Sequence, residues 1–477
     1  MSRYDLLIKG GTLVTADQDG IAADIGVKDG IVTAIAADLP ADQAEQVVDA
    51  SGHVVLPGGV DPHFHIGIYQ PVEQDAFHET QSSLVGGATT VVSYFRTGSH
   101  YLDKTGPYKD IFPEVVEKTT GRAHTDFGYH LAPMTKKQVG EIDRLAGEDG
   151  VPSFKLYMFY KGLNLAADST DAGAYTMADS YDLGHEYAVM EAISAANDKY
   201  ADRRVSLSIH CEQSELLTFF IDRVRGNGNP QGLDAWSAAR PPLSERVAIG
   251  ETVALAAATG CPINLLHLSS REALETAVEA RKAHPHMDMR LETTLHFLAL
   301  SNDRLTGLGG KVNPPLRTTD DIDALWEGVR DGWIDWVGSD HACCMMAQKG
   351  DDLWHALPGF GGTGLLYPVL LSEGYHKRGI PLSRIVQIAS TTSAKAYDLY
   401  PKKGTIAVGS DADFAIVDLD LEQTVTTDML LSAQDHTPFE GVDVKGWPTT
   451  TILRGNVVYQ DGKVIGQPIG QFIKRPA

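Results

Sequence analysis

Cysteine, long apolar runs and positive charge are all scarce in this sequence of 477 residues. Its four cysteines, two of them adjacent at Cys343 and Cys344, give no disulfide framework and suit a reducing compartment. No apolar run approaches the roughly 20 residues that a membrane-spanning helix needs. The formal net charge of -23 disfavours binding to nucleic-acid phosphates. Residues 1–5 enter a strand pattern without a secretory signal, so we expect a cytoplasmic globular protein with no membrane or nucleic-acid partner.

Both ends of the chain have the pattern of small β-sheets. Over residues 4–56, and again after about residue 401, short apolar runs alternate with turns rich in Gly and Asp. Two β-rich ends around a different middle predict one β-sandwich domain, built from residues 1–56 together with residues 401–477.

The middle of the chain, residues 57–400, alternates compact apolar strands with helical patterns. The clearest strand candidates are residues 91–95, 205–209, 263–266 and 336–338, and the clearest helical patterns are residues 186–198, 244–258 and 270–283. Such alternation predicts βαβ units and a parallel sheet. About eight such units favour a closed TIM-like (β/α)8 barrel, in which function belongs at the carboxyl ends of the strands. The fold class is therefore α/β.

Five segments at the ends of predicted strands carry side chains that bind metals. The residues are His63, His65, Lys155, His210, His267 and Asp340. Four imidazoles, a carboxylate and a lysine suit two divalent ions around an activated water molecule. His63 and His65 are two residues apart, so an extended strand end directs both imidazoles to the same side. The set predicts the active site of a hydrolase.

Each of these residues also has a simpler structural interpretation when it is considered alone. His63 and His65 fit a pair of hydrogen-bonded surface histidines, and His210 and His267 each fit a core histidine. Asp340 fits a helix N-cap or a turn. We favour the metal site because it accounts for all six residues in the order of the barrel strands.

Lys155 lies in the apolar strand pattern of residues 151–158, where an unpaired ammonium is costly. Burial lowers the pKa of a lysine, and the neutral amine reacts with carbon dioxide to form a carbamate. Its two oxygens are enough to bridge two metal ions, which predicts N6-carboxylysine at Lys155. A lysine that pairs with a carboxylate, or that extends to solvent, is the alternative for this residue alone.

Together these segments resemble the amidohydrolase superfamily, in its cyclic amidase branch of dihydropyrimidinases, hydantoinases and allantoinases. The resemblance runs nearly end to end. It rests on the segments 55–65, 153–155 with Tyr160, 239–242, 404–413 and 437–441.

The resemblance implies a hydrolase that opens a cyclic amide or ureide ring by attack of a metal-bridging hydroxide. His63, His65 and Asp340 would hold the more buried ion. His210 and His267 would hold the other, and carboxylated Lys155 would bridge the two. Six residues would thus hold two ions.

A carboxylate at Asp340 can also accept the proton of the bridging water and return it to the leaving nitrogen. The resemblance implies roles for two further residues. Tyr160 would donate a hydrogen bond to the developing oxyanion. Asn313 would hold the cyclic amide of a small-molecule substrate, largely by its main chain. The implied metal is usually Zn²⁺, although Mn²⁺, Co²⁺ or Ni²⁺ suit the ligands, and the implied assembly is a homotetramer.

Several positions depart from the pattern of the branch. Asn313 stands where hydantoinases usually have Ser and is closer to a dihydroorotase, yet Gly67 replaces the dihydroorotase arginine that holds the substrate carboxylate. Residues 357–359, 93–96 and 294–296 also differ from the usual segments. Arg96 and His296 could both approach the pocket, or could be a salt-bridged loop arginine and a packed histidine.

Two other functions remain open. The same machinery could hydrolyse an acyclic amide, carbamate or thiocarbamate. A non-catalytic scaffold, like the collapsin-response-mediator proteins, is disfavoured because such relatives have lost metal ligands and here none is missing.

Overall fold

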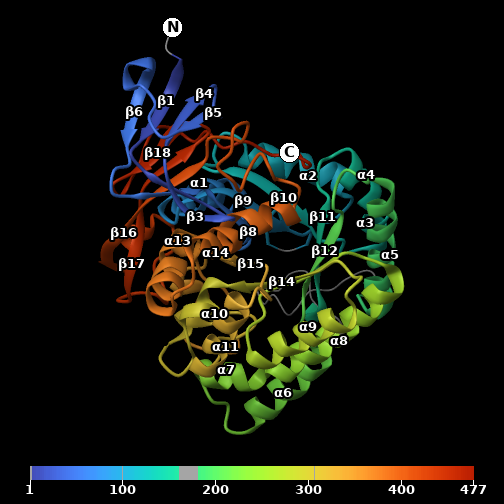
Figure 1. Ribbon diagram of the computed structural model, residues 1–477. Coiled ribbons are helices and arrows are strands. Elements are labelled where there is room, and N and C mark those ends of the chain that lie inside the picture. Colours follow the sequence, from blue (N-terminus) through green and yellow to red (C-terminus); the bar gives the residue numbers. More distant parts are fainter. Residues whose placement is uncertain (1–2, 99, 161–180, 306) are drawn as a thin grey trace.

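The computed structural model describes residues 3–98, 100–160, 181–305 and 307–477. Figure 1 shows a β-rich part that combines the first and last segments of the chain, next to a larger α/β part built from the middle. No helix of the described residues is long and apolar enough to cross a membrane.

The β-rich part contains two sheets. The first has the order β5-β4-β1-β6 and comes entirely from the N-terminal segment, and the second has the order β19-β18-β17-β16-β7-β2-β3. The strands are β1 (Tyr4–Lys9), β2 (Thr12–Thr15), β3 (Gln18–Ala22), β4 (Asp24–Lys28), β5 (Ile31–Ala36), β6 (Ala44–Asp49), β7 (Val54–Pro57), β16 (Phe414–Thr424), β17 (Asp443–Leu453), β18 (Asn456–Gln460) and β19 (Lys463–Val464). Because β7 pairs with both β2 and β16, the two ends of the chain share one sheet. The boundaries at residues 56 and 401 stay a prediction.

The middle of the chain forms eight strands that pair in sequence order, each parallel to the next. They are β8 (Gly59–Phe64), β9 (Ala88–Phe95), β10 (Asp126–Leu131), β11 (Ser153–Tyr157), β12 (Ser206–His210), β13 (Ile263–Leu265), β14 (Met289–Thr294) and β15 (Trp336–Gly338). A parallel bridge between Phe64 and His341 brings the first strand to the end of the last. The backbone N–H of His65 donates to the carbonyl of His341 at 2.9 Å. The predicted barrel is confirmed.

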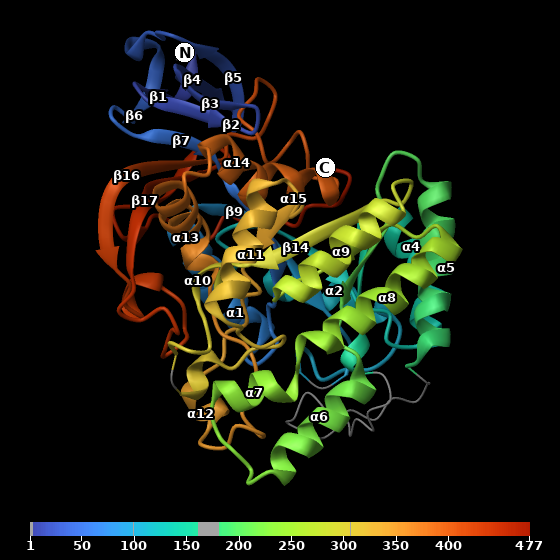
Figure 2. The same ribbon diagram turned by 60° about the horizontal axis from the view of Figure 1, so that its bottom comes forward.

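Helices follow the strands and cover the outside of the barrel, with α5, α8 and α9 neighbouring one another (Figure 2). The α-helices are α1 (Val72–Val85), α2 (Tyr108–Thr119), α3 (Lys136–Val139), α4 (Ile142–Gly147), α5 (Leu183–Lys199), α6 (Ser214–Gly226), α7 (Leu233–Ala239), α8 (Pro242–Thr259), α9 (Arg271–Ala283), α10 (Leu295–Ala299), α11 (Thr319–Arg330), α12 (Met346–Lys349), α13 (Leu366–Val369), α14 (Leu382–Val386) and α15 (Thr392–Ala396). Shorter 3-10 and π segments are η1 (Ala41–Gln43), η2 (Met158–Tyr160), η3 (Leu308–Gly310), η4 (Thr363–Leu365), η5 (Leu370–His376), η6 (Gln387–Thr391) and η7 (Asp428–Leu430).

Local signals explain where the helices begin and end. The Ser270 hydroxyl accepts a hydrogen bond from the Ala273 N–H and caps the start of α9. Helix α8 ends at Gly260, whose φ of 74° is in the left-handed region that glycine adopts without strain. The expected helices at 186–198, 244–258 and 270–283 are therefore confirmed with slightly different ends.

A buried ion cluster ties the β-rich part to the barrel. The Lys403 ammonium donates to Asp126 at 2.6 Å, at the start of β10, and to Asp413 at 2.7 Å, next to β16. It also lies 2.8 Å from Asp411. Three carboxylates around one ammonium hold the pKa of Lys403 above its usual range, despite the burial that opposes the charge.

Candidate active site

All six predicted metal ligands line one cavity at the carboxyl ends of the barrel strands. The walls of this cavity include His63, His65, Lys155, His210, His267 and Asp340. Tyr160 and Asn313 line the same cavity. The structure therefore brings the six predicted ligands, Tyr160 and Asn313 together at one cavity.

His63, His65 and Asp340 form the first group. His63 is the penultimate residue of strand β8 and His65 directly follows this strand. Asp340 follows β15, the strand on the other side of the barrel seam. The Nε2 atoms of His63 and His65 lie 2.9 Å and 3.2 Å from Asp340 Oδ1. One ligand atom from each residue lies within 4.8 Å of the others, so a single ion can contact all three.

The protonation states of Asp340 and His65 suit the binding of a metal ion. Burial disfavours an ionised Asp340, but the neighbouring imidazoles of His63 and His65 hold its pKa well below the usual range. Burial lowers the pKa of His65 to about 4, despite its hydrogen bond with Asp340. An ionised carboxylate and a neutral imidazole are the forms that bind metals.

His210 and His267 form the second group. His210 ends strand β12 and His267 follows β13, and the His267 Nε2 atom lies 2.8 Å from His210 Nδ1. Burial lowers the pKa of His210 to about 4, which keeps its ring neutral. The His63 and His267 ring centres are 5.4 Å apart, so the second group lies directly beside the first.

The backbone is strained at one ligand of each group. His267 has a φ of 35° and Asp340 a φ of 49°, in the left-handed region where a residue other than glycine is uncommon. Such strain persists only where the surrounding structure enforces it, and it concentrates at functional sites. At both positions the chain turns sharply out of a strand and directs the side chain into the cavity.

Lys155 lines the same cavity as the two groups and lies in the middle of strand β11. Its side chain is buried, and the Nζ atom stands 4.3 Å from the centre of the Tyr94 ring and 4.9 Å from that of Tyr157. Among the described residues no carboxylate forms an ion pair with this amine. Burial outweighs the distant charges of Asp340 and Glu292 and lowers its pKa to about 8, so a reactive neutral amine is accessible near neutral pH.

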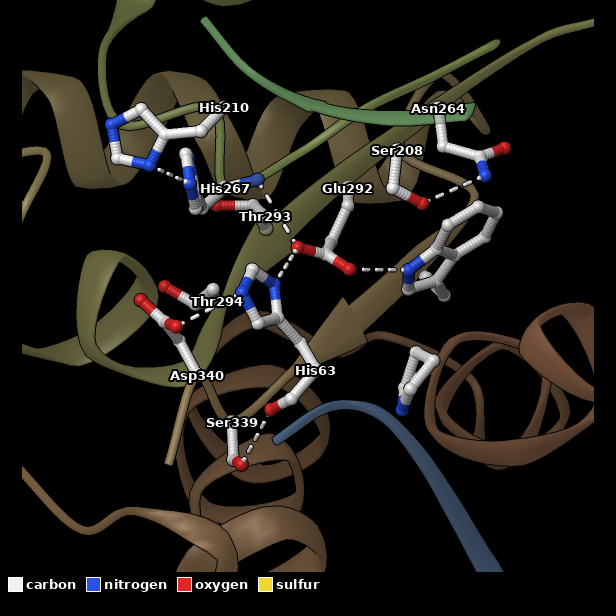
Figure 3. A network of polar contacts seen from close by, with 12 residues as sticks. His63, Ser208, His210, Asn264, His267, Glu292, Thr293, Thr294, Ser339 and Asp340 are labelled. Atoms are coloured by element: carbon white, nitrogen blue, oxygen red, sulfur yellow. Dashed lines mark hydrogen bonds and ion pairs between the residues drawn. The ribbon is translucent and has the colours of Figure 1, made fainter. Parts of the chain in front are cut away.

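The sequence analysis missed Glu292, a buried carboxylate on β14 that orients both groups (Figure 3). Its Oε1 atom accepts from His63 Nδ1 at 2.6 Å and from the His267 backbone N–H at 3.2 Å, and its Oε2 accepts from Trp336 Nε1 at 2.7 Å. Burial opposes the charge on His63, yet Glu292 and Asp340 raise the pKa of this imidazole to about 9. Glu292 thus fixes the ring so that Nε2 faces the cavity.

Glu212 performs the same task for His210 and also had no predicted role. Its Oε2 atom accepts from His210 Nε2 at 2.6 Å, which leaves Nδ1 facing His267. Arg240 donates from Nε to Glu212 Oε1 at 3.0 Å and pairs with Oε2 as well. Although burial opposes the charge, Arg240 and His210 lower the pKa of Glu212 to about 2.

The remaining predicted residues fall on the cavity wall, with one exception. Tyr160 ends the 3-10 segment η2, and the Asn313 side-chain oxygen is buried without a hydrogen-bond partner in the described parts of the chain. Arg96, which follows β9, also lines the cavity. His296 is not among the lining residues, and its Nε2 atom instead contacts the Thr294 hydroxyl at 2.9 Å.

A closed barrel whose strands converge on four imidazoles, a carboxylate and a buried amine defines the chain as a barrel enzyme of the hydrolase class. The chain belongs to the amidohydrolase family, whose sequence model matches residues 54–458.

Curated relatives and solved structures place it in the cyclic amidase branch. The chain is 30% identical to the D-hydantoinase of Ralstonia pickettii, over 99% of both chains. It is also 30% identical to the allantoinase of Rubrobacter xylanophilus, over 99% of this chain and 98% of the relative. The dihydropyrimidinase structure from Brevibacillus agri covers 98% of both chains with a TM-score of 0.86 and 28% identity. The predicted family and enzyme class are confirmed.

Proposed function

We propose that this protein opens the ring of a small cyclic amide or ureide by hydrolysis, with two divalent metal ions. The observation that carries the proposal is the set of six candidate ligand residues around one cavity. The relatives of the chain, which include hydantoinases, support the same kind of substrate. The hydrolysis of an acyclic amide or carbamate by the same residues is the alternative that an assay has to separate.

The side chains fit two metal ions. His63, His65 and Asp340 would hold one ion, because one ligand atom of each lies within 4.8 Å of the others. His210 and His267 would hold the other, because their facing ring nitrogens lie 2.8 Å apart on the wall of the same cavity. Imidazole nitrogens with an ionised carboxylate suit Zn²⁺ or a similar ion, and binding of the ion would displace the proton that His63 carries near neutral pH.

Lys155 would supply the anion between the two groups. Its neutral amine nitrogen would attack the carbon of carbon dioxide and lose a proton, which gives a carbamate with two oxygens. The buried position beside Tyr94 favours the neutral amine that this reaction needs.

When bound, the two ions would activate a water molecule and polarise the ring carbonyl. Asp340 would accept the proton of that water and deliver it to the ring nitrogen as the carbon–nitrogen bond breaks. Tyr160 would donate its hydroxyl hydrogen to the oxyanion. Asn313, through its main chain and its buried amide oxygen, would orient the ring.

Glu292→Gln should weaken metal binding at the first group by about 10- to 100-fold, because the neutral amide accepts the His63 hydrogen bond less strongly. Titration of the metal-free protein with Zn²⁺ measures this change. Glu422→Gln, at a position in β16 that lies far from the cavity lining, is the matched control. An unchanged zinc affinity in Glu292→Gln would remove Glu292 from the site.

The function is tested by offering dihydrouracil, hydantoin, allantoin and a linear carbamate to the metal-loaded protein side by side. We expect hydrolysis of at least one ring, and loss of that activity when a chelator removes the metal. Hydrolysis of the carbamate alone would favour the acyclic alternative. No hydrolysis together with no bound divalent ion would refute the proposal.

Two further expectations concern the protein as a whole. A homotetramer, as the resemblance implies, would give a mass in light scattering four times that of the single chain of 51.5 kDa. A cytoplasmic location also stays a prediction, consistent with four free cysteines in the structure.

A further inference from the structure

Arg96 occupies a place beside the ligand groups that the proposed chemistry does not use. It directly follows strand β9, so its side chain stands at the carboxyl edge of the barrel. The side chain is only 2% exposed and lines the same cavity as His65 and Asp340. Because a guanidinium is always protonated in proteins, Arg96 places a permanent positive charge in the wall of this cavity.

Aromatic rings hold the guanidinium of Arg96 in this place. Its central carbon lies 5.6 Å from the centre of the Tyr101 ring and 5.5 Å from that of Tyr160. The Tyr101 hydroxyl lies 2.9 Å from His65 Nδ1, so one side chain connects Arg96 to a predicted metal ligand. Because Tyr160 is the proposed oxyanion donor, Arg96 adjoins the position where the substrate carbonyl would lie.

The described walls of the cavity are cationic on balance. Asp340 is their single acidic residue, and its carboxylate faces the imidazoles of His63 and His65. The positive charge of two divalent ions would exceed the negative charge that Asp340, a carboxylated Lys155 and a hydroxide together supply. Arg96 adds one further positive charge in a setting of low dielectric, where charge interactions are strong.

We propose that the substrate ring carries a carboxylate substituent, and that Arg96 binds this carboxylate and sets the specificity of the enzyme. The proposal rests on the ring-opening function given above and names its substrate class. The planar fork of a guanidinium matches the two oxygens of a carboxylate, which a lysine ammonium does not. The aromatic walls formed by Tyr69, Tyr101 and Tyr157 would enclose the ring itself.

A purely structural role predicts a different result. If Arg96 only packs against Tyr101 and Tyr160 through cation–π contacts, its removal disturbs the cavity wall and lowers kcat/KM for acidic and neutral substrates alike. A role in binding carboxylate affects the acid selectively. The ratio of kcat/KM for two substrates that differ only in this charge therefore separates the two roles.

The test uses a ring ureide with a carboxymethyl substituent and its carboxamide counterpart, with the metal-loaded enzyme. The wild type should prefer the acid by at least tenfold in kcat/KM. In Arg96→Met this preference should fall by about 30-fold, within the range for hydrogen bonds to charged groups. The loss should appear mainly in the KM of the acid. Arg96→Lys, which keeps the charge without the fork, should retain part of the preference.

A binding measurement supplements the kinetics. The ring-opened product of the acid, titrated calorimetrically into wild type and Arg96→Met, should bind the variant about 30-fold more weakly. Arg246→Met changes an exposed arginine on α8, with 61% side-chain exposure, and should leave both measurements unaltered. If Arg96→Met does not fold, the wild-type preference and Arg96→Lys decide the question.

The outcomes separate this inference from the proposed function. If the wild type opens neither ring, the ring-opening function fails. If it opens the rings without preferring the acid, or if Arg96→Met and Arg96→Lys lower kcat/KM for both substrates in equal proportion, the carboxylate inference is overturned and the ring-opening function stands.

Discussion

Lys155→Ala should abolish ring opening, with a loss on the order of 10⁴-fold or more in kcat, as expected when one member of a unit that acts together is removed. The substitution would remove the proposed carbamate anion between the two proposed metal ions. We expect the metal content to fall from two ions per chain to one or fewer, as measured by atomic emission on the purified protein. Lys155 is buried among aromatic rings, so circular dichroism should confirm that the variant folds.

The carbamate itself gives a second measurement. Wild-type protein equilibrated with ¹³C-labelled bicarbonate should show a carbamate carbon resonance that Lys155→Ala lacks. Lys377→Ala, which changes a lysine with 55% side-chain exposure, should keep the resonance, both metal ions and full activity. Two bound ions and intact turnover in Lys155→Ala would refute the bridging role.

Asp340→Asn should lower kcat on the order of 10³-fold, within the range for loss of general acid–base catalysis. The amide has the shape of the carboxylate but cannot accept the proton of the attacking water. KM should change little, because the proposed role of Asp340 is to act on the reacting atoms. The same substitution weakens the first metal group, since His63 and His65 both face the Asp340 carboxylate.

Steady-state kinetics at saturating metal separate these two effects of Asp340→Asn. Excess Zn²⁺ should restore the occupancy of the first group without restoring kcat. Asp420→Asn, on a side chain with 89% exposure, is the control for a lost surface charge. Recovery of full kcat at high metal would show that Asp340 is a ligand only and carries no proton.

The sequence predicted the barrel, and it predicted which side chains the barrel brings to one cavity, because both depend on local patterns. A buried parallel strand is a short apolar run, and each ligand lies in such a run or within two residues of its end, as at His210 on β12 and His267 after β13. The position of a ligand along the chain thus already determines which edge of the sheet it occupies. Closure of the barrel then brings Asp340 to His63 without any further signal.

The supporting carboxylates could not be predicted in the same way. Glu292 contacts His63, which lies 229 residues away in the sequence. Glu212 contacts His210 and lies just after strand β12, where a charged residue is common and gives no signal of a special role. A signal for Glu292 did exist, since an acidic residue inside the apolar strand pattern of residues 289–294 is costly without a partner. The identity of that partner depends on the neighbouring strands, which only the three-dimensional structure provides.

The barrel seam has a consequence for biosynthesis. His65 and Asp340 meet across the junction of β8 and β15, although 275 residues separate them in the chain. A ribosome therefore completes most of the barrel before Asp340, the third proposed ligand of the first ion, is made, so the proposed site is incomplete in a shorter nascent chain. In the proposed site, the three ligands of the first ion would therefore come together only once the last strand of the barrel has been made and has closed against the first.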